Sequence, residues 1–355
     1  MSELREERIL GIIETARGKP RRFRDAQITM AHGAGGKATQ SLIEGLLLPA
    51  FGTDALSELG DAGFVGDLAL TTDSFVVKPI RFPGGSIGEL AVNGTVNDLA
   101  VAGARPEALT LSLVLEEGLG AETLQAEVEA IAGAARAAEV DVVAGDTKVV
   151  ERGHCDEMYI CTTGMGRRDP RAAMSPRSLR PGDRILVSGP VGEHGMAVML
   201  ARGEFDLVAP IESDTAPLWP AVDALLDAAG TDLRCIRDAT RGGVASVLNE
   251  LARASGVAIL AQEGAVPVDP AVAGAAELLG IDPLYVANEG KLLAFVAPES
   301  ADAALTALRA VPGCERAADI GEVKTEPPAM VLVDTAFGGR RVMDQLVGDP
   351  LPRIC

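Results

Sequence analysis

Three segments in the first half of the sequence carry aspartates whose spacing could serve chemistry. "TTDSFVV" places Asp73 at the end of a predicted strand, and "NGTVNDLAV" places Asn97 and Asp98 on a predicted helix. "VVAGDTK" places Asp146 and Lys148 at the end of another strand. Carboxylate and amide oxygens suit a Mg²⁺ ion that holds a nucleoside triphosphate. Each aspartate alone is also explained as a helix or turn cap, but three in one half favour a magnesium site of Asp73, Asp98 and Asp146.

A glycine-rich loop precedes these segments in the stretch "AHGAGGK". Backbone N–H groups at the start of the helix that follows favour an anion such as a phosphate. The loop does not match the P-loop pattern, because Ala31 and Ala38 stand where a glycine and a Ser or Thr are required. It matches the dinucleotide-binding fingerprint only weakly, and a simple glycine-rich turn remains the alternative. The loop residues predicted to bind a cofactor, together with Asn97, are Gly33, Gly35, Gly36 and Lys37.

Two further segments in the second half contain acids beside glycines. In "RDATRGG", helix capping is sufficient to explain Asp238 and Thr240. In "YVANEGK", Glu289 lies at a turn close to Lys291 and is a candidate proton acceptor. A solvated loop residue is the alternative interpretation of Glu289.

The overall composition limits the class of protein. The chain has 355 residues and a net charge of −19, which argues against nucleic acid or an anionic membrane surface as partner. No stretch approaches the ~18 apolar residues of a membrane helix, and acids stand where a signal peptide would be basic and then apolar. The sequence has five cysteines, an odd number, and no C-x-x-C motif, so nothing in it suggests a disulfide framework. We therefore expect a cytoplasmic protein.

The apolar pattern predicts alternating strands and helices. Leucines at alternate positions predict a strand over 107–117, and helical spacing predicts helices over 121–139 and 241–255, the latter ending at Gly256. The Pro- and Arg-rich stretch 168–183 is predicted to join two α/β domains. The predicted divisions are an N-terminal extension (1–25), an ATP-binding and dimerisation domain (26–171), a second α/β domain (172–335) and a mobile tail (336–355).

Taken together, these motifs resemble the superfamily of aminoimidazole ribonucleotide synthetase, selenophosphate synthetase and thiamine-monophosphate kinase. The matching stretches are "HGAGGK", "TTDSFVVKPIRFPGG", "NGTVNDLAVAGARP", "GDTKVV", "RDATRGG", "LYVANEGK" and the terminal "PRIC". The terminal "PRIC" points within the superfamily to the HypE hydrogenase maturation proteins. The resemblance implies a two-domain α/β (α+β) fold with mixed sheets, flanking helices, a flexible tail and a homodimer. Residues 1–25 and Ser86, where Asp or Asn is expected, depart from the family pattern.

The resemblance also implies an activity for the final residue. HypE proteins carry a carbamoyl group on the C-terminal cysteine, here Cys355, and use ATP with Mg²⁺ to dehydrate it to a thiocyanate that supplies cyanide to [NiFe]-hydrogenases. A thiol is a strong nucleophile at neutral pH, and phosphorylation of the carbamoyl oxygen would make it a leaving group. Lys148 and Glu289 are the residues that we expect to assist dehydration. The implied partners are a carbamoyltransferase that loads Cys355 and an iron-scaffold complex that receives the cyanide.

Two other interpretations are open at this point. The chain could be another ATP-dependent enzyme of the superfamily, although no cysteine precedes the glycine loop as it does in selenophosphate synthetases. It could also be a non-catalytic scaffold that binds a nucleotide and docks partners through its tail. ATP turnover in the presence of a carbamoyl donor separates the enzymes from the scaffold.

Overall fold

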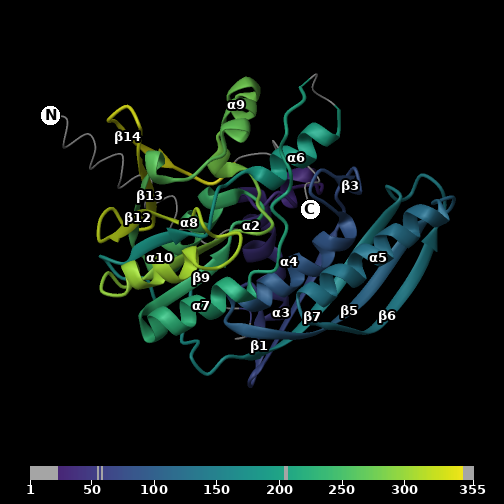
Figure 1. Ribbon diagram of the computed structural model, residues 1–355, viewed down its shortest axis with the longest axis horizontal. Coiled ribbons are helices and arrows are strands. Elements are labelled where there is room, and N and C mark those ends of the chain that lie inside the picture. Colours follow the sequence, from purple (N-terminus) through teal and green to yellow (C-terminus); the bar gives the residue numbers. More distant parts are fainter. Residues whose placement is uncertain (1–22, 54–55, 57–58, 204–206, 347–355) are drawn as a thin grey trace.

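The computed structural model describes residues 23–53, 56, 59–203 and 207–346 (Figure 1). Within these residues the strands form one five-stranded sheet, one seven-stranded sheet and a two-stranded ribbon. Both large sheets contain antiparallel pairs and one parallel pair each, β5 (Ala104–Glu116) with β6 (Asp141–Val150) and β10 (Ala258–Gln262) with β13 (Met330–Asp334). The predicted α/β class with mixed sheets is therefore confirmed.

The first sheet has the strand order β1-β2-β7-β5-β6. Two helices, α4 (Ile87–Val101) and α5 (Ala121–Ala137), lie over one face of it, as Figure 1 shows. Buried apolar residues of α4 and of the strands form a shared core. The strands of this first sheet are β1 (Gly63–Val65), β2 (Leu68–Phe75), β5 (Ala104–Glu116), β6 (Asp141–Val150) and β7 (Met158–Arg168). The two-stranded ribbon consists of β3 (Arg81–Phe82) and β4 (Gly85–Ser86).

The second sheet has the order β14-β13-β10-β12-β8-β11-β9. Helix α8 covers one face through Val244, Leu248 and Leu251, and helices α7 and α10 pack on the other face. Its strands are β8 (Arg184–Val187), β9 (Leu233–Asp238), β10 (Ala258–Gln262), β11 (Leu292–Val296), β12 (Ala318–Lys324), β13 (Met330–Asp334) and β14 (Arg340–Met343). Besides α4 and α5, the α-helices of the described residues are α2 (Lys37–Leu42), α3 (Leu48–Phe51), α6 (Glu193–Ala201), α7 (Trp219–Ala229), α8 (Gly243–Ser255), α9 (Pro270–Leu279) and α10 (Ala301–Arg309).

Local sequence explains where the central elements begin and end. Helix α8 ends at Gly256, whose φ of 66° is the left-handed conformation expected of a C-terminal glycine. The helix predicted in "NGTVNDLAVAGARP" ends before Gly103, with φ of 79°, and Pro106 is already part of β5. The strand predicted over 107–117 is confirmed as β5.

Two predicted domain limits differ from the structure. Residues 340–343 form β14, which pairs with β13, and Met343 is buried. Residues 340–343 are therefore part of the second sheet, and the predicted limit at residue 336 does not coincide with the end of that sheet. The glycine loop and α2, assigned to the first domain, instead contact the second domain, because the Lys37 amine pairs with Asp344 at 2.7 Å. The connection between the two sheets, residues 169–183, contains no helix or strand among its described residues and includes the predicted junction near 171.

No helix in the described part of the chain is both long and apolar enough to cross a bilayer.

Candidate active site

Four aspartates from separate elements meet where the two domains join. One carboxylate oxygen each from Asp61, Asp98 and Asp238 lies within 4.8 Å of the others. Asp61 precedes β1, Asp98 lies on α4 and Asp238 ends β9. Asp73, on β2, is close enough to Asp98 to interact directly with its side chain. We refer to Asp61, Asp73, Asp98 and Asp238 as the acidic cluster.

The acidic cluster brings like charges together where Asp238 is buried and Asp61, Asp73 and Asp98 are partly buried. Burial, followed by repulsion from Asp73, Asp238 and Asp61, raises the pKa of Asp98 well above its ordinary value. Burial and then the charge of Asp61 raise the pKa of Asp238 to about 8. The pKa values of Asp61 and Asp73 are also raised, mainly by burial. Such a cluster of oxygen ligands has the chemistry of a site for hard divalent cations.

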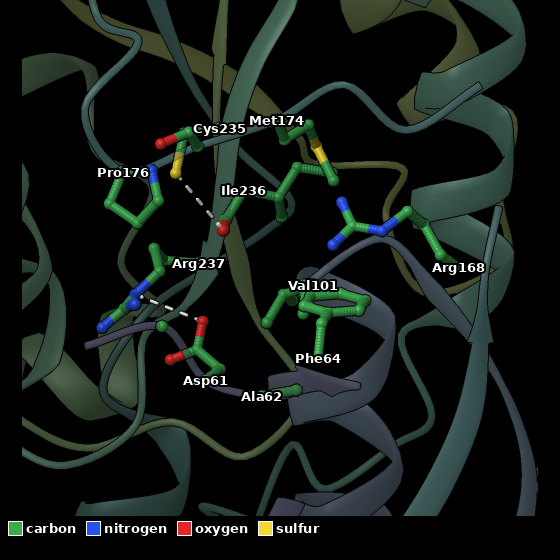
Figure 2. A pocket seen from close by; sticks show the side chains of 13 residues that line it. Asp61, Ala62, Phe64, Val101, Arg168, Met174, Pro176, Cys235, Ile236 and Arg237 are labelled. Atoms are coloured by element: carbon green, nitrogen blue, oxygen red, sulfur yellow. Dashed lines mark hydrogen bonds and ion pairs between the residues drawn. The ribbon is translucent and has the colours of Figure 1, made fainter. Parts of the chain in front are cut away.

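Hydrogen bonds and an ion pair hold these carboxylates in place. The Thr71 hydroxyl donates to Asp98 Oδ2 at 2.8 Å, and the Thr95 hydroxyl lies 3.3 Å from Asp73 Oδ2. Arg237 Nε pairs with Asp61 Oδ2 at 3.2 Å, and Figure 2 shows the guanidinium of Arg237 turned toward the Asp61 carboxylate. A second ion pair joins Arg237 to Glu250 of α8 at 3.1 Å. The positions of the cluster side chains are therefore set by both domains.

Two cavities share Gly60, Pro176 and Arg237 in their walls, and Asp61 of the acidic cluster lines the smaller one. The smaller one, of about 310 Å³, lies between Asp61 and β9 and is shown in Figure 2. The larger one, of about 590 Å³, has Gly35 and Gly36 at its edge. Its volume is in the range of small-molecule sites.

Glu289 lies close to the same cluster. It is 4% exposed, and its Oε1 atom has no hydrogen-bond partner among the described residues. Burial, and then the charges of Asp238 and Asp214, raise the pKa of Glu289 well above its ordinary value. A buried carboxyl with a free oxygen and a raised pKa can exchange a proton with a bound molecule.

Asn97 makes contacts that differ from those expected of a nucleotide ligand. Its Nδ2 donates to the carbonyls of Ala216 (2.9 Å) and Glu289 (3.2 Å), and its Oδ1 accepts the N–H of Leu218 at 2.7 Å. Both ends of the amide are therefore used within the protein. The structure gives Asn97 a bracing role between α4 and Glu289.

The predicted glycine loop is in contact with the end of the described chain. The Lys37 N–H donates to the Leu346 carbonyl at 3.3 Å. A side chain at Gly36 would bring its Cβ within 2.6 Å of that carbonyl. Arg241 donates to the Gly33 carbonyl at 2.6 Å, and Gly35 has the positive φ of 74°. In this state the start of α2 binds residue 346, so the Lys37 N–H already has an acceptor.

Asp146 and Lys148 lie away from the acidic cluster of their own chain. Both are on β6, where the Lys148 amine pairs with Asp146 at 2.6 Å. Strands β7 and β5 separate β6 from the strand of Asp73, a distance of about 14 Å at ~4.8 Å per strand. Asp146 is also in register with Ser112 and Cys161, on the face opposite to that of Asp73. Within one chain, Asp146 therefore does not complete a site with Asp73 and Asp98.

Two members of the cluster were not predicted from the sequence. Asp238 was explained as a cap, although its place at the end of an apolar strand is the signal that identified Asp73. Asp61 lies in the loop "LGDAG" and has no local signal of this kind. The terminal Cys355 lies outside the described residues. Among the other thiols, burial raises the pKa of Cys155 and Cys314 and raises that of Cys235 to about 12.

Comparisons with known proteins match this architecture. Residues 59–168 match the family described as AIR synthase related protein, N-terminal domain, and residues 180–333 match its C-terminal domain. The carbamoyl dehydratase HypE of Bradyrhizobium diazoefficiens is 46% identical over 337 residues, covering 94% of this chain and 97% of that protein. The HypE of Azotobacter vinelandii is 48% identical over 337 residues, covering 94% and 98%.

Solved structures give the same result. A HypE chain in a HypE–HypF complex superposes with a TM-score of 0.83 at 43% identity, over 86% of this chain and 99% of that chain. A HypE protein solved in complex with ATP superposes with a TM-score of 0.78 at 44% identity, over 93% of this chain and 100% of that chain. The resemblance and the two-domain fold predicted from the sequence are thus confirmed. With relatives more than 40% identical along almost its whole length, the chain belongs to the HypE family of carbamoyl dehydratases.

Proposed function

We propose that this protein uses ATP to dehydrate a carbamoyl group on the Cys355 thiol to a thiocyanate, which supplies cyanide for [NiFe]-hydrogenase assembly. The observation that carries the proposal is the acidic cluster beside the buried Glu289, in a chain 46% identical to a carbamoyl dehydratase. ATP as co-substrate is supported by the ATP complex of a HypE protein.

The acidic cluster is the proposed site for the magnesium of Mg-ATP. Its carboxylates supply oxygen ligands, and burial followed by mutual repulsion raises their pKa values, so a bound cation would favour their ionised forms. When bound, magnesium would neutralise phosphate charge. Of the predicted ligands, Asp73 and Asp98 belong to this group, joined by Asp61 and Asp238.

The proposed reaction balances without a further reagent. The carbamoyl oxygen of the thiocarbamate attacks the γ-phosphorus of ATP, and ADP leaves. The nitrogen then loses its two protons, one to the protein and one to the departing phosphate, while the C–O bond to phosphate breaks, leaving S–C≡N, ADP and phosphate. Glu289 is the proposed proton acceptor because it is buried near the cluster and its Oε1 is free to contact substrate.

The position of Leu346 supports access of the terminal cysteine to this site. Leu346 lies against Gly36 at the edge of the larger cavity. Nine further residues follow Leu346, of which Cys355 is the last. At ~3.3 Å per residue they span at most about 30 Å. We propose that this reach lets the thiol visit both a donor enzyme and the acidic cluster.

We infer that the enzyme is a homodimer in which β6 faces the partner. Strand β6 is exposed along nearly its whole length, with Val143 64% and Val149 67% exposed, and it is an edge strand of the described sheet. The outer face of this sheet carries Thr72 and Thr163, so it is not a continuous apolar surface. The proposed roles of Asp146 and Lys148 then require that they act on the cluster of the partner subunit.

A subunit-mixing experiment tests this arrangement. Asp73→Asn and Lys148→Ala proteins, each expected to be inactive alone, should regain activity when their subunits are exchanged, because one of the two sites in a mixed dimer is intact. Absence of recovery with proven exchange would contradict a shared site. A monomeric mass by light scattering at micromolar concentration would contradict the dimer itself.

Mass spectrometry of the C-terminal peptide tests the proposed function. With a carbamoyl donor alone, Cys355 should gain a carbamoyl group, and with Mg-ATP it should then lose one water. Cys355→Ser should show neither change while still binding nucleotide. Glu289→Gln should bind ATP but keep the carbamoyl group. Modification at another cysteine would contradict the proposal.

The proposed partners follow from the same chemistry. A carbamoyltransferase would load Cys355, and the HypE–HypF complex of a relative supports a stable protein partner. An iron-scaffold complex would accept the cyanide. ATP turnover without any change at Cys355 would instead favour another reaction of the superfamily, and absence of turnover would favour a scaffold.

A further inference from the structure

The backbone of Glu289 is held from two sides by side chains that are distant in sequence. On one side, Asp214 accepts the N–H groups of Glu289 at 3.1 Å and Gly290 at 3.2 Å. On the other side, Asn97 Nδ2 donates to the Glu289 carbonyl at 3.2 Å. Asp214 belongs to the connection before α7, and Asn97 belongs to α4. We call this arrangement the Glu289 clamp.

Asp214 is itself fixed by charge and packing. Its side chain is 1% exposed, and Lys291 Nζ lies 3.1 Å from Oδ2. Lys291 also pairs with Glu193 at 3.3 Å. Hydrogen bonds to a charged group are stronger than neutral ones. The backbone at Gly290 is also packed closely against that of Asp214, because a Cβ built at Gly290 would lie 1.9 Å from the Asp214 carbonyl oxygen.

The connection that carries Asp214 is attached to the first domain. Asn97 binds it at the Ala216 carbonyl and the Leu218 N–H. The Ser213 N–H donates to the Pro83 carbonyl at 2.8 Å. Glu289, which lies just before β11 in the second domain, is therefore held in a fixed position relative to α4 in the first domain.

The hydrogen bonds of the Glu289 clamp are made to the backbone of Glu289 and not to its side-chain carboxyl group. Its Oε1 has no hydrogen-bond partner among the described residues. A Cβ built at Gly94 of α4 would lie 3.9 Å from Oε2, so the carboxyl faces the helix that carries Asp98. A fixed backbone with an open reactive group is the arrangement of a pre-organised site.

We propose that Asp214 and Asn97 are positioning residues that set the Glu289 carboxyl for proton transfer, an inference that rests on the role of Glu289 proposed above. Asn97, predicted from the sequence to bind the cofactor, acts instead through the backbone of Glu289. Loss of the clamp should therefore affect the chemical step and leave nucleotide binding largely intact.

The test compares dehydration rate with ATP affinity in the full-length protein loaded on Cys355. Asp214→Ala should slow the loss of water about 100-fold, as expected for a misplaced catalytic group, and change the Kd of ATP by no more than about twofold, because the chemical step alone is affected. Asp214→Asn keeps one acceptor for the two N–H groups, so its rate should fall only about tenfold.

Asp183→Ala is a matched control. Asp183 is also buried, accepts the N–H of Arg180 and pairs with Arg234. It lies next to Arg184, which pairs with Val296 at the far end of β11 from Glu289, about 20 Å along the strand. This variant should lose stability but, at a temperature where it is folded, dehydrate at the wild-type rate.

The outcomes separate the inference from the proposed function. A wild-type rate in folded Asp214→Ala, or an equal loss in Asp183→Ala, would overturn the positioning role. If Asp214→Ala does not fold, Asp214→Asn decides, and a wild-type rate in that variant would also overturn it. A wild-type protein that never loses water contradicts the proposed function, and an active Glu289→Gln contradicts the role of Glu289.

Discussion

The acidic cluster should make the metal-free protein less stable than a variant with one carboxyl group fewer. In Asp238→Asn, an amide of the same shape replaces a carboxyl whose pKa is raised from 3.8 to about 8 by burial and by Asp61. An acid with a raised folded-state pKa does not affect stability below pH 3.8, where it is protonated both folded and unfolded. Between pH 3.8 and 8 the unfolded chain releases the proton and the folded chain keeps it, so the free energy of unfolding falls.

The size of this effect follows from the pKa shift. At ~1.4 kcal/mol per pH unit, the cost is on the order of 2 kcal/mol at pH 5 and 4 kcal/mol at pH 7, levelling off above pH 8. In EDTA, Asp238→Asn should therefore be more stable than the wild type by up to about 4 kcal/mol at pH 7. The advantage should shrink to about half of that at pH 5.

Urea denaturation between pH 5 and 8 measures this difference. Asp302→Asn, an exposed aspartate on α10, is the control and should change stability by less than about 0.5 kcal/mol. Magnesium at about 100 times its Kd should stabilise the wild type by about 2.7 kcal/mol and the variant much less. This account of the cluster would be refuted if Asp238→Asn were less stable than the wild type at pH 7 in EDTA. It would also be refuted if the difference in free energy of unfolding between the two proteins did not depend on pH.

Three further predictions concern other residues. Asp73→Asn should abolish ATP hydrolysis, measured as phosphate release, with an unchanged circular dichroism spectrum; wild-type turnover would remove Asp73 from the site. Gly36→Ala should lower the free energy of unfolding by about 1–3 kcal/mol, because its Cβ meets the Leu346 carbonyl at 2.6 Å. Gly274→Ala on α9, which has open space around its Cβ, is the control, and equal stability of both variants would contradict the packing argument. Cys235, whose pKa is raised to about 12 by burial, should resist iodoacetamide at pH 7.5 in the folded protein, and rapid labelling there would show that it is not buried.

The local pattern of the sequence was sufficient to predict most elements and part of the site. Strand β5 and helix α8 follow from apolar alternation and from helical spacing with a terminal glycine, both of which are properties of neighbouring residues. Asp73 and Asp98 were recognised because a carboxylate at a strand end or within an apolar helix is unusual by local criteria. Glu289 was recognised for a similar reason, and the family followed from motifs that are contiguous in the chain.

Only the tertiary structure decided which of these residues meet. The strand order places β7 and β5 between β2 and β6, and this separates Asp146 from Asp73 although both strands carry the same local signal. Strand order depends on pairings between distant segments, which no local period encodes. For the same reason Asp61, in an unremarkable loop, joins the cluster through its contact with Arg237. Asn97, typical of a ligand by sequence, is instead used by backbone groups more than a hundred residues away.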